Sequence, residues 1–205
     1  MQEMIAVALI TILAVVSPGR DFAMVTRNSY LYGRRAGWWT AAGIAAAVWI
    51  HVGYTLLGVS VLLLKFPALF HGVKLLGALY LVYIGWQTFR HKPVNADLGE
   101  AAARLGDAAA FKNGFVTNAL NPKTTLFVLS TFTQIVQPQT PLWLQTAYGA
   151  FMSLAHLLWF AFVAAVLPSP AIRNRLLQKQ QFVNRIIGVL LALLGVLLMV
   201  SSLNG

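Results

Sequence analysis

The sequence contains no cysteine and very little charge. Among its 205 residues, charged side chains make up only 10%, against about 25% in an average soluble domain. The absence of cysteine excludes disulfides, thiolate zinc sites and dithiol redox chemistry. The low charge, together with 59% hydrophobic residues, excludes a disordered chain and an ordinary cytosolic enzyme, because water does not readily solvate so apolar a surface.

Acidic residues are especially scarce. The chain has 5 Asp and Glu against 15 Lys and Arg, which gives a net charge of +10. On a soluble protein this excess would suggest a nucleic-acid partner, whereas on a membrane protein it marks the cytoplasmic loops. The first apolar segment carries Glu3 where a signal peptide has a basic start, and no small-residue cleavage site precedes Pro18. We therefore expect this segment to be retained as part of the fold.

Six apolar segments are long enough to cross a hydrocarbon core of about 30 Å. They predict an all-α membrane protein in which residues 1–205 form a single transmembrane domain. The longest connection, residues 90–112, includes an alanine-rich stretch, Glu100–Phe111, that we expect to form a short surface helix. The six segments are Met4–Tyr32, Ala36–Leu64, Pro67–Phe89, Asn113–Val136, Leu142–Leu167 and Phe182–Leu203.

Basic residues gather on one set of connections if the six spans alternate in direction. Cytoplasmic loops carry the excess of Lys and Arg in membrane proteins, so we predict that both termini are periplasmic. The basic loops are thereby explained without nucleic acid. The predicted cytoplasmic side holds Arg27, Arg34, Arg35, Arg90, Lys92, Arg104, Lys112, Arg173, Arg175, Lys179 and Arg185, and the other side holds Lys65 and Lys74.

Proline interrupts the first and fourth segments at matched positions. Pro18 and Pro122 are 104 residues apart, and His51 and His156, on the second and fifth segments, are 105 residues apart. This spacing indicates a duplicated three-span unit, with one repeat at 1–89, a cytoplasmic loop at 90–112 and a second repeat at 113–205. Because three is an odd number, the second repeat must be inverted, which is a recurring plan of secondary transporters.

The two breaks predict a polar site near the middle of the membrane. Proline removes a backbone donor and frees a carbonyl, and freed backbone groups are tolerated in a membrane only against protein or water. Half-helix N-termini at such a site also suit a carboxylate. The alternative is that both breaks are packing kinks. The candidate residues for a substrate or ion pathway are Ser17, Pro18, Gly19, Asp21, Asn118, Asn121, Pro122 and Lys123.

Charged side chains beside the breaks have two interpretations each. Asp21 is the only carboxylate inside a predicted span away from its ends, so it is a candidate to carry a coupling proton or to hold a substrate ammonium. Alternatively it neutralises a cation such as Arg20, Arg27 or Lys123. Lys123 and Arg20 are candidates to pair with a substrate carboxylate, or they snorkel or form a salt bridge to Asp21.

Two histidines and an asparagine complete the candidates. His51 and His156 suit a proton relay because histidine titrates near neutrality, although a lone histidine in a span more often bonds a neighbouring helix. Asn28 offers an amide to orient a substrate, and Asn121 is either a cap for freed backbone or a ligand. The histidines have no intramembrane acid partners at metal spacing, so no metal site is expected.

The residues around the two breaks match known motifs. The first motif is Ser17-Pro18-Gly19-Arg20-Asp21-Phe22 with Arg27-Asn28-Ser29 and Gly33-Arg34-Arg35-Ala36-Gly37, and the second is Asn118-Ala119-Leu120-Asn121-Pro122-Lys123. Together they resemble the signatures of the LysE/RhtB family of amino-acid exporters. Length, span count and the charged central loop agree, so the resemblance covers essentially the whole chain.

The resemblance implies a multi-pass exporter in the bacterial inner membrane. We expect no cofactor. Family substrates include lysine, arginine, homoserine, threonine, leucine and cysteine derivatives, and export is driven by the proton gradient or the membrane potential. The matched breaks and the charges beside them lead us to expect an alternating-access cycle. The family's functional positions fall here on Pro18, Gly19, Asp21, Asn121, Pro122 and Lys123.

One residue departs from the family pattern, and two other functions compete. Arg20 stands where the family has a second proline, which would make the break less sharp, neutralise Asp21, create an anion site or reduce transport. A non-transporting membrane scaffold is the first competing function, since glycine-rich helix faces allow homo-oligomers. The second, an intramembrane enzyme, lacks a serine–histidine or acid–histidine set within one helical turn, so we expect no enzyme.

Overall fold

The chain folds into helices alone in the part that can be described. The structure is a computed structural model that describes residues 2–91, 105–137 and 139–203. Within these ranges every regular element is an α-helix. The helices are α1 (Gln2–Val16), α2 (Arg20–Tyr32), α3 (Arg34–Lys65), α4 (Pro67–Arg90), α5 (Asp107–Ala119), α6 (Pro122–Ile135), α7 (Leu142–Val166) and α8 (Pro170–Leu203).

Four of these helices are long and apolar enough to span a membrane, and α1 and α2 together add a fifth candidate among the described residues. The α1–α2 pair bends by 53° at its break. α5 and α6 have only 13 and 14 residues and do not qualify as a span by this measure, so the sixth span stays a prediction. The four qualifying segments are Arg34–Val59, Ala68–Arg90, Leu142–Val166 and Lys179–Ser202.

Two helices differ from the segments that the sequence predicts. The last helix begins at Pro170, twelve residues before the predicted segment. Proline suits the first position of a helix, and no helix-breaking residue follows it in the polar turns that precede the apolar segment. The predicted surface helix Glu100–Phe111 lies partly outside the described residues. Its described end, from Asp107, is the first turn of α5 and runs without interruption to Ala119.

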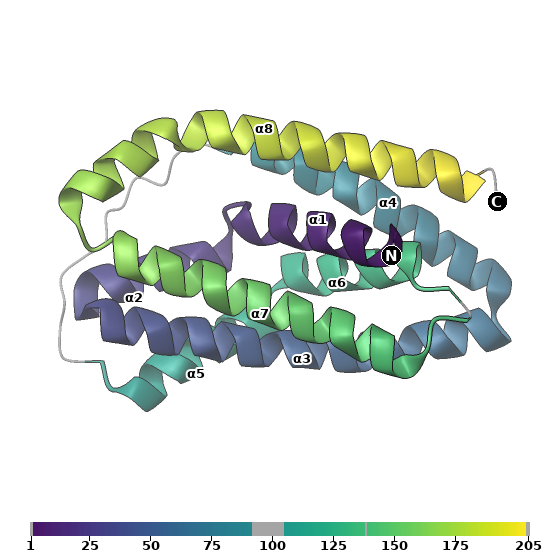
Figure 1. Cartoon of the computed structure of the whole chain (residues 1–205), viewed down its shortest axis with the longest axis horizontal. Coiled ribbons are helices and arrows are strands. Elements are labelled where there is room, and N and C mark those ends of the chain that lie inside the picture. Colours follow the sequence, from purple (N-terminus) through teal and green to yellow (C-terminus); the bar gives the residue numbers. More distant parts are fainter. Residues whose placement is uncertain (1, 92–104, 138, 204–205) are drawn as a thin grey trace.

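The helices run along one direction in two groups (Figure 1). α4 and α8 lie side by side and antiparallel, while α3 packs against α5 and α7. α1 and α6 lie in the middle of the bundle, and both termini lie at the same end of the molecule (Figure 1). The connections at 32–34 and 166–170 lie at the opposite end (Figure 1).

Glycines allow the closest helix contacts. A Cβ added at Gly43 of α3 or at Gly114 of α5 would overlap backbone atoms of the other helix. A Cβ at Gly85 of α4 would lie 2.7 Å from the carbonyl oxygen of Gly188 on α8, and a Cβ at Gly188 would lie 2.5 Å from that of Gly85. Lipid provides no hydrophobic drive for helices to associate, so close backbone packing of this kind stabilises the bundle.

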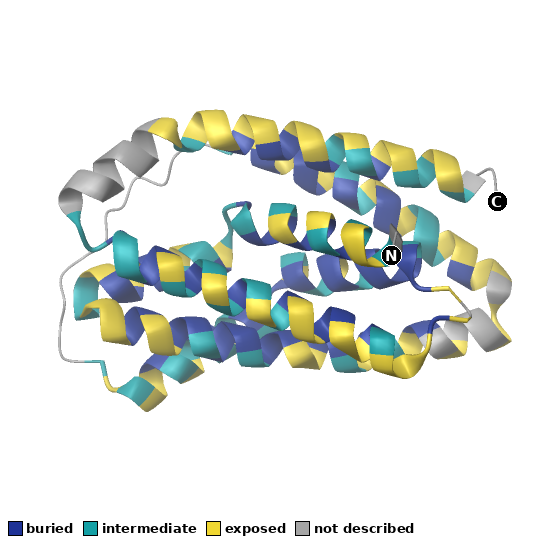
Figure 2. Ribbon diagram, viewed as in Figure 1, coloured by how far each residue is buried: buried dark blue, intermediate teal, exposed yellow. Residues whose placement is uncertain are grey.

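The outer surface of the bundle is apolar, as a lipid-facing surface must be. The main core joins α1, α3, α6 and α7 through side chains that include Ile10, Val48, Phe127 and Met152. Outward-facing positions are exposed along most helices (Figure 2). Many of them are large and apolar, and indoles lie near helix ends, where they anchor a protein at the membrane interface. The exposed indoles at helix ends are Trp38, Trp39, Trp86 and Trp143.

Candidate functional site

The two helix breaks meet and bind each other through their cations. Lys123 Nζ, on the first turn of α6, donates to the Ser17 carbonyl at 2.7 Å and lies 3.5 Å from that of Pro18, at the end of α1. In return, Arg20 at the start of α2 donates from Nη1 to the Leu120 carbonyl at 3.2 Å, just after α5. Each cation thus binds carbonyls at the C-terminal end of a half-helix, where the helix dipole is negative.

Local sequence explains the shape of each break. At the second break Asn121 caps α6, because its side-chain oxygen accepts from the Lys123 backbone N–H at 3.0 Å, and Pro122 occupies the first helical position, which needs no N–H. At the first break Gly19 is extended, with φ −171° and ψ −165°. Any residue adopts this conformation, but a Cβ there would touch Lys123 Cδ at 3.4 Å.

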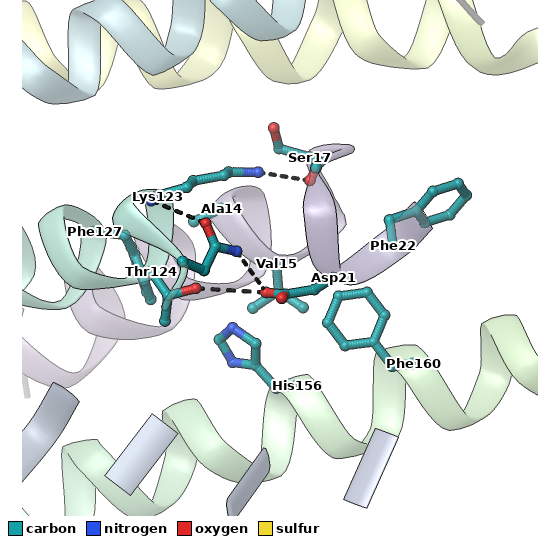
Figure 3. Close-up of a pocket in the computed structure, with 12 residues that line it drawn as sticks. Ala14, Val15, Ser17, Asp21, Phe22, Lys123, Thr124, Phe127, His156 and Phe160 are labelled. Atoms are coloured by element: carbon teal, nitrogen blue, oxygen red, sulfur yellow. Dashed lines mark hydrogen bonds between the residues drawn. The ribbon is translucent and has the colours of Figure 1, made fainter. Parts of the chain in front are cut away.

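Asp21 is the centre of the polar network (Figure 3). It is the only buried acidic residue in the described chain, with 6% of its surface exposed. Its Oδ2 accepts from Asn118 Nδ2 at 2.9 Å and from Asn121 Nδ2 at 3.0 Å, with Thr124 Oγ1 at 3.5 Å. Its Oδ1 is buried and has no partner in the described chain. The carboxylate is therefore held by neutral donors, and no described cation forms a salt bridge with it.

Arg20 does not neutralise Asp21. Its side chain is exposed and reaches the Leu120 carbonyl instead. Nor does Arg20 remove the break, because α1 and α2 still bend by 53°. A proline at this position would occupy the first residue of α2, where its missing N–H has no intrahelical role.

The two histidines have different surroundings despite their matched positions in the sequence. His51 Nε2 donates to the Asn118 carbonyl at 2.9 Å, and its Nδ1 accepts from Tyr54 at 2.6 Å, so His51 holds backbone at the second break. His156 Nδ1 donates to the Met152 carbonyl of its own helix at 2.7 Å. The other nitrogen of His156 has no hydrogen bond in the described chain, and its ring lines the pocket beside Asp21 (Figure 3).

A small pocket, here called the central pocket, lies between α1, α2, α6 and α7 (Figure 3). A water molecule's centre can occupy about 20 Å³ of it, which is room for about one water. An amino acid does not fit without movement of the helices. The lining residues are Ala14, Val15, Ser17, Gly19, Asp21, Phe22, Asn121, Lys123, Thr124, Phe127, His156 and Phe160.

Some predicted site residues lie outside this pocket. Asn118 is completely buried and donates to Asp21 without lining the pocket. Pro122 is exposed, and Pro18 lines a neighbouring cavity. Asn28 lies elsewhere, where its Nδ2 donates to Thr40 Oγ1 at 2.9 Å and links α2 to α3. Ser17 lines the pocket and also shares a 2.6 Å hydrogen bond with Thr88 of α4.

Six residues that line the pocket are not among the predicted site residues: Ala14, Val15, Phe22, Thr124, Phe127 and Phe160. Thr124 contacts Asp21, and three phenylalanines form the apolar wall. Helical spacing could have identified two of the phenylalanines, because Phe127 lies one turn after Thr124 and Phe160 one turn after His156. Phe22 follows Asp21 directly in the sequence. No group of three His, Asp or Glu side chains in the described ranges is placed to hold a metal ion.

These features define a helical, multi-pass membrane protein with a buried polar site where the α1–α2 and α5–α6 connections meet. Residues 12–202 match the model of the LysE type translocators. The chain therefore belongs to the LysE family of transporters, as the motifs indicate, and is a multi-pass membrane protein of the bacterial kind.

Two similar proteins align with nearly the full chain, and a third aligns with part of it. The chain is 28% identical over 195 residues to the uncharacterized membrane protein YahN of Escherichia coli, covering 94% of this chain and 87% of that protein. It is 27% identical over 198 residues to a threonine efflux protein of Salmonella typhimurium, covering 95% and 96%. A leucine efflux protein of Salmonella choleraesuis is 30% identical over 132 residues, covering 63% and 61%. No solved structure matches the chain.

Proposed function

We propose that this protein exports amino acids or close derivatives across the bacterial inner membrane by alternating access, with the central pocket as its binding site. The observation that carries the proposal is the Asp21 carboxylate, buried among neutral donors with one oxygen left without a partner. Such a group accepts either a substrate ammonium or a proton. The efflux activities named for the threonine and leucine relatives support the same substrate class.

The substrate's two charged groups match the groups at the breaks. Its ammonium binds Oδ1 of Asp21 and the carbonyls of Ser17 and Pro18, and its carboxylate binds Lys123. To do so Lys123 leaves the Ser17 carbonyl, which it contacts at 2.7 Å in this structure. Substrate binding therefore exchanges a contact between the two breaks for contacts with the ligand, and the α1–α2 break is released from α6.

Proton binding resets the empty transporter. After release of the amino acid to the outside, an inward-moving proton neutralises Asp21, and His156 lies beside it as a relay candidate. The proton gradient then drives the return of the binding site to the cytoplasmic side. A zwitterionic substrate carries no net charge, so each cycle moves one positive charge inward and also responds to the membrane potential.

The contacts between the halves support an inverted repeat of two three-span units with six spans in all. Lys123 and Arg20 bind each other's breaks, and Gly85 and Gly188, 103 residues apart, each approach the other's carbonyl. Reciprocal contacts of this kind are expected from a pseudo-two-fold axis in the membrane plane. α5 and α6 together form the sixth span in this arrangement.

We also propose that both termini are periplasmic. The chain lacks cysteine, so Ser201→Cys introduces a single thiol close to the C-terminus. A membrane-impermeant maleimide should label it in intact cells, and labelling only after cell lysis would contradict the orientation.

Purified protein in liposomes tests the transport function directly. Preloaded amino acids should exchange across liposomes that contain this chain alone, and the absence of any flux across a broad panel would favour a non-transporting scaffold. Lys123→Ala should reduce exchange at least tenfold, because the substrate carboxylate loses its counter-charge. Lys65→Ala is the matched control, because Lys65 is an exposed lysine at the C-terminal end of α3. This variant should exchange at the wild-type rate. A wild-type rate for Lys123→Ala would remove that residue from the mechanism.

A further inference from the structure

A second cavity lies beside the central pocket, on the other side of the first break. A water molecule's centre can occupy about 110 Å³ of it, and its wall is mostly apolar, with Gln180 and Asn184 as polar side chains in the described lining. We call it the side cavity. Its walls come from the end of α1, from α2, from the second half of α7 and from α8, and they include Val16, Pro18, Phe22, Trp159, Val166 and Val183.

The two cavities share the first break as a partition. Ser17 and Gly19 line the central pocket, whereas Val16 and Pro18 line the side cavity. Residues that line the two cavities thus alternate along this short segment, which presents one face to each cavity. Phe22 lines both cavities, and it follows directly after Asp21, the residue that we propose binds the ammonium.

The sizes of the two cavities suit different parts of one ligand. The central pocket has room for about one water. The side cavity approaches an engineered apolar cavity of about 150 Å³ that binds benzene. A space of this size accommodates a branched group of three or four carbons without rearrangement, while the charged groups of the substrate need the central pocket to open.

We propose that the side cavity is the subsite for the substrate's side chain, and that the preferred substrates are amino acids with aliphatic side chains, of the size of valine and leucine. This inference rests on the proposed transport function. Phe22 is the partition that moves aside as the charged groups enter the central pocket, and it then closes over the side chain.

The chemistry of the walls gives the order of preference. Each buried methylene changes affinity about fourfold, so leucine binds better than alanine. Apart from Trp159, Gln180 and Asn184, the described lining consists of apolar side chains. A threonine hydroxyl that lies against these apolar side chains loses its water hydrogen bonds, so threonine ranks below valine, which has the same shape. None of the described lining residues is charged, so the side chains of lysine and arginine would be buried without a counter-charge and are rejected.

Substitutions that fill or join the cavities test the inference. Val166→Phe places a ring in the side cavity and should lower the ratio of leucine to alanine exchange at least tenfold in liposomes. Phe22→Ala joins the cavities and should extend exchange to phenylalanine. Val189→Phe, an exposed position on α8 that lines neither cavity, is the control and should leave the ratio unchanged. The ratio within one sample does not depend on how much protein inserts.

The outcomes separate this inference from the proposed function. If the wild type exchanges amino acids but Val166→Phe keeps the wild-type ratio, the side cavity is only a lipid-filled space and the inference is wrong. If Val166→Phe does not accumulate, Val183→Phe fills the same cavity from α8 and decides the question in the same way. If the wild type exchanges lysine faster than leucine, the aliphatic preference is wrong while transport stands. If it exchanges no amino acid, the proposed function itself is overturned.

Discussion

Two substitutions of Asp21 separate its chemical role from its structural role. In Asp21→Asn the amide oxygen takes the place of Oδ2 and accepts from Asn118 and Asn121, while the amide nitrogen takes the place of the unpartnered Oδ1. The network keeps its acceptor but loses the negative charge and the proton site. In Asp21→Ala both oxygens disappear.

The contacts of Asp21 set the size of the effect. Without its carboxylate, Asn118 Nδ2 still donates to Thr124 Oγ1 at 3.1 Å. Asn121 Nδ2 has no other acceptor in the described chain and is buried. A buried donor left without a partner costs about 1–3 kcal/mol, and for a chain of this size each kcal/mol corresponds to about 2–4 °C in Tm. Asp21→Ala should therefore melt about 2–12 °C below wild type, and Asp21→Asn should melt close to it.

Transport and thermal unfolding in detergent are measured on the same preparations. We expect both variants to lose amino-acid exchange at least tenfold, and only Asp21→Ala to lose stability. Wild-type exchange in Asp21→Asn would refute the role of this carboxylate in binding an ammonium or a proton. Equal melting temperatures for all three proteins would refute the hydrogen-bond network as a source of stability.

Three further predictions concern the break, the packing and an exposed ion pair. Arg20→Pro should insert and melt like wild type, because the residue begins a helix and contributes one exposed hydrogen bond; aggregation would show that the arginine is needed for folding. Gly114→Ala should lower stability by about 1–3 kcal/mol, because its Cβ overlaps the backbone of α3, while Gly53→Ala, with open space around it, should not; equal melting of the two variants would contradict the close packing. The hydrogen bond from Arg35 lowers the pKa of Asp107 below its ordinary value of 3.8. The stabilisation from this pair is therefore fully present above that value and disappears as pH falls through the lowered pKa, so melting curves of wild type and Asp107→Asn should converge in acid; a difference that persists in acid would contradict the assignment.

The apolar segments and the prolines of the sequence predicted most of the helix boundaries. The second, third and fifth predicted segments agree with α3, α4 and α7 to within two residues at each end. α1 ends at Val16, two residues before Pro18, and α6 begins at Pro122, a first helical position where proline needs no N–H. The start of α8 was missed, since a polar turn outside the apolar segment gives no signal of membrane length.

Chemical type identified Asp21 as a candidate but not its partners. A carboxylate within an apolar segment is conspicuous in any sequence, and the motif pointed to Asn121 and Lys123 as well. Asn118 and Asn121 donate to Oδ2 of Asp21, whereas Oδ1 has no partner in the described chain. This arrangement could not be predicted, because the two asparagines lie about 100 residues from Asp21 in the sequence. The matched histidines were equivalent by spacing, yet only His156 lines the pocket.

What the sequence determined by itself is local: helices and their interruptions, the membrane environment, and the family. These follow from the composition and order of neighbouring residues, which decide whether each stretch can satisfy its own backbone in lipid. What only the tertiary structure decided is which carbonyl Lys123 and Arg20 bind, which oxygen of Asp21 is left open, and that Phe22 stands between a tight polar pocket and a larger apolar cavity. Those features arise where helices distant in the chain pack together, and their geometry is set by the fit of side chains across the contact.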